Sequence, residues 1–343
     1  MATTIKKRCG PRQTTLPRFP GFISSVTSYL VDSRKSLFAT VNHDFCHENN
    51  SMIETTLHKL DAVRKATKPS RLLILVVGEQ PFHETSIHLH RVRVIRQDAF
   101  SKCTQLTHVD LPDTVRVIEE FAFSECCMQS VTWPKTVPAI AENTFDNCTS
   151  LQTIDIPDGV IEIKDNAFSN CSSLIEMHMP NSVIRVGDSA FEWCESLETV
   201  VFSNQIERIR ESTFESCTSL HDVTFPSKLQ YIDDGAFCGC SNIEAIYLPA
   251  TVKYIGYYAF SDCSSLNMIH IQKDTMNQLS KTEPVRIGPC AFCGCFALER
   301  MVCPNDIVVH VGSDAFMDCL AFECDYLPAP ITYQKMTWKV LTR

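Results

Sequence analysis

Cysteine and histidine are the residue types whose spacing in this chain could support metal chemistry. Cys290, Cys293 and Cys295 form a C-x-x-C-x-C cluster, and Cys303 follows shortly after it. Cysteine thiolates are good zinc ligands, so this cluster is a candidate metal site. However, Cys295 occupies a position at which cysteine recurs along the chain, and Cys293 repeats Cys238 of an earlier C-G-C phrase. Local duplication therefore explains the cluster, and we expect no metal there.

Three histidines form a second candidate metal site. His88 and His90 share one face of a predicted strand, and His108 is expected on the strand stacked beside it. Three imidazoles in this arrangement could bind zinc. A polar strand face near the end of a repeat array is the favoured interpretation.

Signatures of catalysis and of phosphate binding do not occur in the sequence. It has no Gly-rich phosphate loop, with only 11 Gly in 343 residues, and no G-x-S-x-G phrase. Each candidate acid or base lies within a repeated phrase, so none stands apart as a catalytic constellation. The sequence therefore predicts a protein that is not an enzyme, with no catalytic residues, no cofactor and no metal.

An internal repeat of about 23 residues supplies the elements that must position any functional residue. Its anchor is a Phe followed three residues later by a Cys, and consecutive Phe residues lie 23, 22, 23, 23, 23, 23, 23, 32 and 24 residues apart. A fixed period of this length predicts a solenoid, in which each unit buries its apolar face against its neighbours. The ten anchor pairs are Phe100/Cys103, Phe123/Cys126, Phe145/Cys148, Phe168/Cys171, Phe191/Cys194, Phe214/Cys217, Phe237/Cys240, Phe260/Cys263, Phe292/Cys295 and Phe316/Cys319.

One repeat unit can be read as three short elements. Leu174–Met179 alternates in polarity and predicts a half-buried strand, which Pro180 ends because proline cannot donate a backbone hydrogen bond. Val183 and Val186 predict a short extended segment on the opposite wall. Asp188–Glu192 predicts a single helical or 3₁₀ turn that directs an Ala-Phe pair into the core.

The repeated phrase A-F-x-x-C-x-S-L-x-x-(V/I)-x-(I/L)-P resembles that of the BspA-like leucine-rich repeat proteins, and the resemblance covers residues 92–328. It implies a right-handed leucine-rich-repeat solenoid with a parallel β-sheet on its concave face and short helical or 3₁₀ turns opposite. It also implies a binding role, with partners that differ between family members. The phrase begins at Ala122, Ala167, Ala190, Ala236, Ala259, Ala291 and Ala315.

The sequence predicts four segments. Residues 1–35 are expected to be a disordered basic tail, or alternatively an organellar transit segment, because they are rich in Lys and Arg. Residues 36–91 are expected to form an N-terminal cap, with a helix from Ser51 to Ala66 and strands at 71–77 and 86–89. Ten repeats at 92–328, with an insertion at 272–284, then lead to a C-terminal cap at 329–343.

Charge and cysteine content restrict the partner and the compartment. The first 90 residues carry 12 Lys and Arg against 7 Asp and Glu, and the remainder carries 19 against 33. An acidic solenoid is a poor match for nucleic-acid phosphates. The 18 Cys are predicted mainly to pack as small apolar residues, and free thiols fit a reducing compartment. We therefore expect an intracellular, cytoplasmic protein without a membrane span, since no apolar run is long enough to cross a bilayer.

The predicted binding site lies on the outward face of the sheet. Side chains two and four positions after each strand-opening Leu should point outward. In the first repeats these residues are acidic or hydroxylic, whereas later repeats carry the types that anchor protein interfaces. The insertion at 272–284 leaves the strand that contains Met268 and His270, so it should lie beside the site. The predicted partner-binding residues are Tyr247, Met268, His270, Arg300 and Tyr326.

The favoured function is a protein-binding scaffold that uses this concave face. One alternative is a thiol-dependent or zinc-dependent protein that uses the Cys-rich repeats, and another is a surface adhesin. The sequence does not identify the partner or the oligomeric state.

Overall fold

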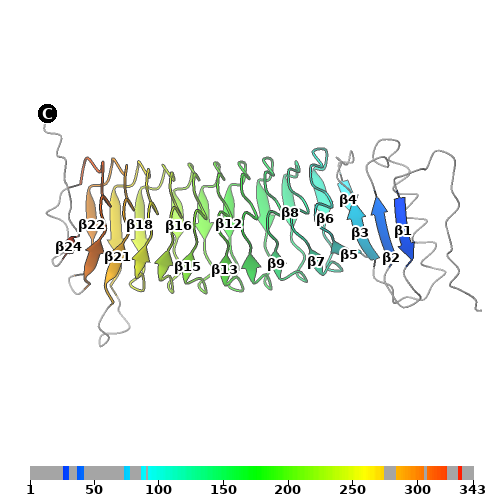
Figure 1. Cartoon of the computed structure of the whole chain (residues 1–343), viewed down its shortest axis with the longest axis horizontal. Coiled ribbons are helices and arrows are strands. Elements are labelled where there is room, and N and C mark those ends of the chain that lie inside the picture. The colour runs from blue at the N-terminus through cyan, green and yellow to red at the C-terminus, as the bar shows by residue number, and fades with distance from the viewer. Residues whose placement is uncertain are drawn as a thin grey trace, which may run out of the picture.

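The computed structural model describes residues 26–30, 37–41, 73–77, 86–89, 92–273, 283–304, 307–322 and 331–333. Short strands form two rows along its length, one above the other in Figure 1. Each repeat contributes one strand to each row, so the chain winds in stacked coils. The predicted repeat solenoid with a parallel sheet is confirmed.

The upper row corresponds to the sheet that the sequence places on the concave face. Its strands fall into four short sheets, within each of which neighbours pair in parallel and in register, as β12, β14 and β16 do. The upper row consists of β4 (Ser86–His88), β6 (His108–Asp110), β8 (Ser130–Thr132), β10 (Thr153–Asp155), β12 (Glu176–His178), β14 (Thr199–Val201), β16 (Asp222–Thr224), β18 (Ala245–Leu248), β20 (Met268–Ile271) and β22 (Arg300–Val302).

The lower row forms the opposite wall of the coils, and its strands also pair in parallel. It consists of β5 (Val92–Ile95), β7 (Val117–Ile118), β9 (Ala139–Ile140), β11 (Glu162–Ile163), β13 (Arg185–Val186), β15 (Arg208–Ile209), β17 (Tyr231–Ile232), β19 (Tyr254–Ile255), β21 (Val285–Ile287), β23 (Val309–Val311) and β24 (Ile331–Tyr333). At the N-terminal end, β1 (Val26–Leu30), β2 (Leu37–Val41) and β3 (Leu73–Val77) extend this row.

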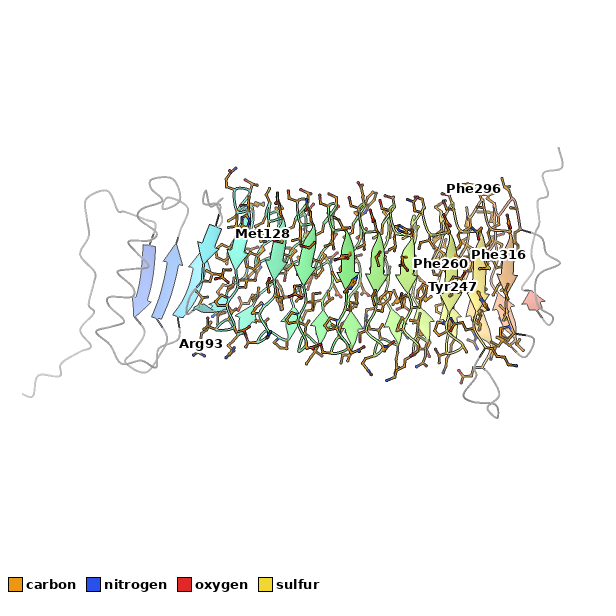
Figure 2. The ribbon with its side chains drawn as sticks, turned by 180° about the vertical axis from the view of Figure 1, so that it is seen from behind. Arg93, Met128, Tyr247, Phe260, Phe296 and Phe316 are labelled. Atoms are coloured by element: carbon orange, nitrogen blue, oxygen red, sulfur yellow. The ribbon has the colours of Figure 1, made fainter. Side chains whose placement is uncertain are left out.

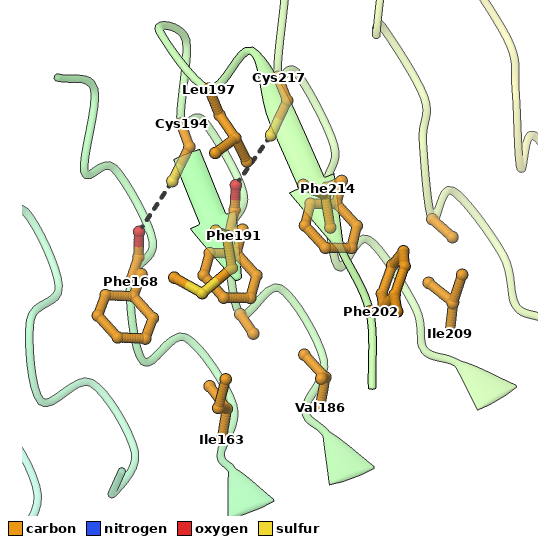
Figure 3. Packing of buried hydrophobic residues seen from close by; sticks show 14 of the residues in the cluster. Ile163, Phe168, Val186, Phe191, Cys194, Leu197, Phe202, Ile209, Phe214 and Cys217 are labelled. Carbon is orange, nitrogen blue, oxygen red and sulfur yellow. Dashed lines mark hydrogen bonds between the residues drawn. The ribbon is translucent and has the colours of Figure 1, made fainter. Parts of the chain in front are cut away.

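The recurring phenylalanines form a continuous stack through the interior. Their rings lie nearly parallel, with centroids 5.1 to 5.7 Å apart from one coil to the next. Aromatic pairs at such centroid distances add to the free energy gained by removing the rings from water. Phe168, Phe191 and Phe214 illustrate the arrangement in Figure 3.

The recurring cysteines pack beside this stack, as predicted, and nine of the ten are fully buried. Each of the recurring cysteines from Cys126 to Cys319 also donates a hydrogen bond from its thiol to the carbonyl of the anchor Phe in the preceding coil. Cys194 Sγ lies 3.2 Å from Phe168 O, and Cys217 Sγ lies 3.2 Å from Phe191 O (Figure 3). The cysteine therefore fills space and also joins neighbouring coils.

The strands predicted from one repeat are confirmed. Leu174–Met179 contains β12, and the segment with Val183 and Val186 contains β13. Val183 and Val186 are buried, whereas Arg185 between them is exposed. Alternation and the strand-ending proline were therefore reliable guides to these elements.

The helical or 3₁₀ turn predicted at Asp188–Glu192 is wrong, and no helix occurs among the described residues. Ser189 has a φ of 51° and Trp193 has a φ of 59°, and left-handed residues at both positions prevent a right-handed helix. Their amides donate instead to the next coil, from Ser189 N to Glu211 O and from Trp193 N to Glu215 O. The turn is thus held by contacts between coils.

The ends of the chain are described only in part. Strands β3 and β4 lie within the two segments predicted as strands. Strand β1 lies within residues 1–35, which were predicted as a disordered tail, and pairs antiparallel with β2. In the predicted C-terminal cap, β24 pairs with β23. The predicted helix at 51–66 and residues 274–282 of the insertion lie outside the described residues. None of the described segments is a helix long and apolar enough to cross a membrane.

Candidate functional site

Three adjacent strands of the upper row, β18, β20 and β22, position the candidate site. In β18, Ile246 and Leu248 point into the core and are buried, so Ala245 and Tyr247, which alternate with them, face outward. The same alternation turns Met268 outward in β20. Strand geometry therefore forces the outward side chains into two columns.

Parallel pairing in register aligns these columns from coil to coil. Tyr247 lies opposite His270, and His270 lies opposite Val302. In the second column, Met268 of β20 lies opposite Arg300 of β22. Neighbouring strands in a sheet are about 4.8 Å apart, so these side chains form one continuous surface. We call the surface of Ala245, Tyr247, Met268, His270, Arg300 and Val302 the Tyr247 patch.

The Tyr247 patch combines aromatic, apolar and cationic groups. The rings of Tyr247 and His270 meet edge to face, with their centroids 5.8 Å apart. Tyr247 is 51% exposed and Val302 is 42% exposed, while Met268 and His270 are half-buried. Arg300 is exposed at the edge of the patch. Figure 2 places Tyr247 among the coils near the C-terminal end.

Four of the five residues predicted for partner binding are thus brought together: Tyr247, Met268, His270 and Arg300. Tyr326 lies outside the described residues. Val302 joins the surface although it was not among the predicted residues. Its sequence signal is its position two residues after Arg300 in an alternating strand, which gives both side chains the same direction.

The charge of the upper row changes where the patch begins. The outward positions of β18, β20 and β22 contain no Asp or Glu. The preceding strands carry acidic and hydroxyl groups at the same positions. These groups include Asp110, Thr132, Thr153, Asp155, Glu176, Asp222 and Thr224. From β6 to β16, His108, His178 and Val201 are the apolar or imidazole side chains at these positions, so the patch differs from the preceding strands mainly in having no carboxylate.

The lower row carries a second ladder, whose residues were not among those predicted for the site. Its outward residue is Arg or Tyr on five successive coils, and the guanidinium of Arg208 lies 4.3 Å from the ring centroid of Tyr231. Arg208 also pairs with Asp233, with 3.0 Å between nitrogen and oxygen. Arg208 and Tyr231 therefore already contact other side chains of the protein itself. Its members are Arg185, Arg208, Tyr231, Tyr254 and Arg286.

The histidine site predicted as an alternative is not assembled as expected. Strand β4 pairs with β6 so that His88 lies opposite Asp110, while His108 lies opposite Ser86. His90 lies outside the described residues. The register therefore does not place His88 and His108 side by side.

The cysteine cluster divides into one buried and two partly exposed thiols. Cys295 is buried and donates to Phe260 O over 3.1 Å, whereas Cys290 and Cys293 are half-exposed. Burial raises the pKa of Cys290, and burial together with nearby Cys290 raises the pKa of Cys293 to about 11. Metal ligation needs thiolates, which a raised pKa disfavours. Among the described residues, no group of three or more His, Cys, Asp or Glu is arranged to hold a metal ion.

A comparison with protein families matches the repeated part of the chain to one family of repeats. Residues 81–198, 185–319 and 275–336 match the BspA type leucine-rich repeat region, in six copies. A comparison with curated proteins found no match.

Solved structures show a similar fold. A leucine-rich repeat protein from Bacteroides ovatus is 23% identical, with a TM-score of 0.56, over 89% of this chain and 81% of that one. A leucine-rich cell surface protein from Faecalibacterium prausnitzii is 20% identical, with a TM-score of 0.49, over 94% of this chain and 96% of that one. At these identities the first similarity is evidence for the fold alone.

Proposed function

Because the chain belongs to the BspA-type leucine-rich repeat family, we propose that it is a non-enzymatic module that binds a protein partner through the Tyr247 patch. The observation that supports this most strongly is the register of β18, β20 and β22. It gathers Tyr247, Met268 and Arg300, which are three types enriched at protein interfaces. A solenoid presents such residues on an extended surface without requiring a pocket.

The patch sets requirements for the partner. Tyr247 and Val302 would bury apolar area, and a Tyr buried at the centre of an interface often contributes most of the binding free energy. Arg300 has no acidic residue at the outward positions of the patch strands, so it would favour a partner carboxylate. We therefore propose a partner segment with an apolar side chain and a neighbouring acidic group.

Compartment is a separate proposal. The described cysteines are all free thiols, which supports a reducing and hence cytoplasmic environment. A surface adhesin would occupy an oxidising environment, which fits free thiols less well. The adhesin alternative stays a prediction.

The test is affinity capture from a native lysate followed by quantitative mass spectrometry. The patch variant carries Tyr247→Glu and Arg300→Glu, which remove the aromatic anchor and reverse the charge beside it. We expect at least one protein to be recovered with the wild type and reduced about tenfold or more with this variant.

The matched control carries Thr132→Glu and Thr153→Glu on β8 and β10. These residues occupy the same two outward columns and are exposed, but they lie outside the patch. The control should recover the same protein as the wild type, and all three proteins should melt at the same temperature. Equal recovery by the patch variant would overturn the proposal.

A further inference from the structure

The turn between β21 and β22 carries two partly exposed thiols at its ends. Cys290 and Cys293 are half-exposed, and Ala291 and Phe292 between them are fully buried. The amide of Cys293 donates to the carbonyl of Cys290 over 3.1 Å. This hydrogen bond from the fourth residue to the first defines a β-turn, in which the two end Cα atoms lie within about 7 Å.

Other coils make the same turn without two thiols. The same backbone bond joins Ser101 to Asp98, Ser169 to Asn166, Cys238 to Gly235, Ser261 to Tyr258 and Met317 to Asp314. Among the described coils, thiols occupy both ends of this turn only at Cys290 and Cys293. The repeat framework therefore conserves the turn geometry, while this coil alone supplies a dithiol.

We propose that Cys290 and Cys293 are a redox-active pair that closes reversibly to an intramolecular disulfide. The spacing permits this, because the Cα atoms of disulfide-bonded cysteines lie about 4.4 to 6.8 Å apart. The buried side chains of Ala291 and Phe292 hold the turn in place, so closure does not require the coil to unfold. Solvent reaches both thiols, so a small disulfide can react with their thiolates. The raised pKa values of Cys290 and Cys293 keep these thiolates scarce at neutral pH, so the exchange should be slow there and faster as pH rises.

Closure proceeds by two thiol–disulfide exchanges with a low-molecular-weight disulfide such as glutathione disulfide. The thiolate of one cysteine attacks a sulfur of glutathione disulfide, forms a mixed disulfide and releases one glutathione thiolate. The thiolate of the other cysteine then attacks the protein sulfur of the mixed disulfide and releases the second glutathione. Two protein thiols are oxidised, one glutathione disulfide is reduced to two glutathione molecules, and the two protons pass to solvent and the leaving thiolates.

Neighbouring thiols are poorly placed to compete. Cys238 occupies the position of Cys293 two coils earlier, and two strand spacings of about 4.8 Å exceed the span that a disulfide bridges. The coil between them carries Ser261 at this position. Cys295 is buried, and the thiols of both Cys295 and Cys319 donate hydrogen bonds to Phe carbonyls of the preceding coils, so they point away from this pair into the core.

The test uses the full chain equilibrated in glutathione buffers from reducing to oxidising, followed by alkylation in denaturant and peptide mapping. Oxidising buffer should lower alkylation of Cys290 and Cys293 together, by about tenfold or more, and yield a peptide with an internal disulfide. Returning the protein to reducing buffer should restore both labels. Cys290→Ser should leave Cys293 as a mixed disulfide with glutathione, and Cys293→Ser should do the same for Cys290.

Cys238→Ser is the matched control, because Cys238 lies at the same place on a turn with a single thiol. Disulfide formation should be unchanged in this variant. If disulfide formation were lost in it, Cys238 would be one of the two bonded cysteines and the proposal would be overturned. Retention of both thiols, or persistent mixed disulfides on both cysteines of the wild type, would overturn the proposal. Thermal melts of all variants establish that each retains its fold.

Discussion

At the scale of single residues, the recurring cysteine joins one coil to the next. The carbonyl of Phe168 accepts two hydrogen bonds, one from Cys171 N at 3.1 Å and one from Cys194 Sγ at 3.2 Å. A carbonyl oxygen has two lone pairs, so both bonds can form together. The sequence predicts the packing role of the cysteine, because its period matches that of the core. It does not reveal the acceptor, since that carbonyl belongs to another repeat.

Replacing one such cysteine should therefore cost more than the loss of its volume. Cys194→Ala removes a fully buried sulfur and its hydrogen bond, and we expect the free energy of unfolding to fall by about 1–2 kcal/mol. Urea unfolding measures this. The control Cys238→Ala changes a half-exposed thiol and should stay within about 0.5 kcal/mol of wild type. Equal effects of the two changes would show that the buried bond has no stabilising role.

At the scale of elements, the strands follow from the sequence and the turns do not. Alternation in Leu174–Met179 gives the strand because one face of it must be buried. The segment Asp188–Glu192 was predicted as helical because the left-handed residues in it and directly after it are Ser189 and Trp193, which lack the usual glycine signal. Their conformation is stabilised by amides that donate to the next coil, and such partners cannot be read from one repeat.

Close approach of coils also makes one glycine position sensitive to substitution. Gly256, Gly288 and Gly312 lie on successive coils, and a Cβ on Gly288 would be 2.8 Å from the carbonyl carbon of Gly256. Gly288→Ala should therefore force backbone movement and cost about 1–3 kcal/mol of unfolding free energy. The control Ser313→Ala alters an exposed side chain nearby and should cost under about 0.5 kcal/mol. A neutral Gly288→Ala in thermal or urea unfolding would contradict this account.

At the scale of the whole molecule, the buried thiols couple stability to alkaline pH. Burial raises the pKa of Cys148 to about 12, and burial likewise raises the pKa values of Cys171, Cys217 and Cys240. In the unfolded chain these thiols ionise near the ordinary value of 9.0. Between the two pKa values the folded state binds more protons than the unfolded state, so stability falls as pH rises.

We expect the urea midpoint to fall steeply as pH rises above about 9, with each protonated buried thiol contributing about 1.4 kcal/mol per pH unit. In Cys240→Ala, the slope of unfolding free energy against pH should decrease by the equivalent of one proton. A midpoint that stays constant from pH 8 to about 11 would contradict the raised pKa values. An unchanged slope in the variant would remove Cys240 from the effect.

Like the fold, the candidate surface could be predicted from the sequence only in part. The outward columns follow from strand alternation, which placed Tyr247, Met268, His270 and Arg300 on one face. The lower-row ladder of Arg and Tyr was not anticipated, because its strands of two or three residues are too short to show alternation. The identity of a partner depends on a second molecule and is not encoded in the repeat pattern.

Site-specific photo-crosslinking would test the central claim most directly. A photoreactive phenylalanine analogue replaces Tyr247 in one protein and Asp155, an exposed outward residue of β10, in another. After irradiation in a native lysate, we predict a discrete crosslinked protein from the Tyr247 position that is missing from the Asp155 position. Identical products from both positions, or no product from the Tyr247 position, would contradict recognition through the Tyr247 patch.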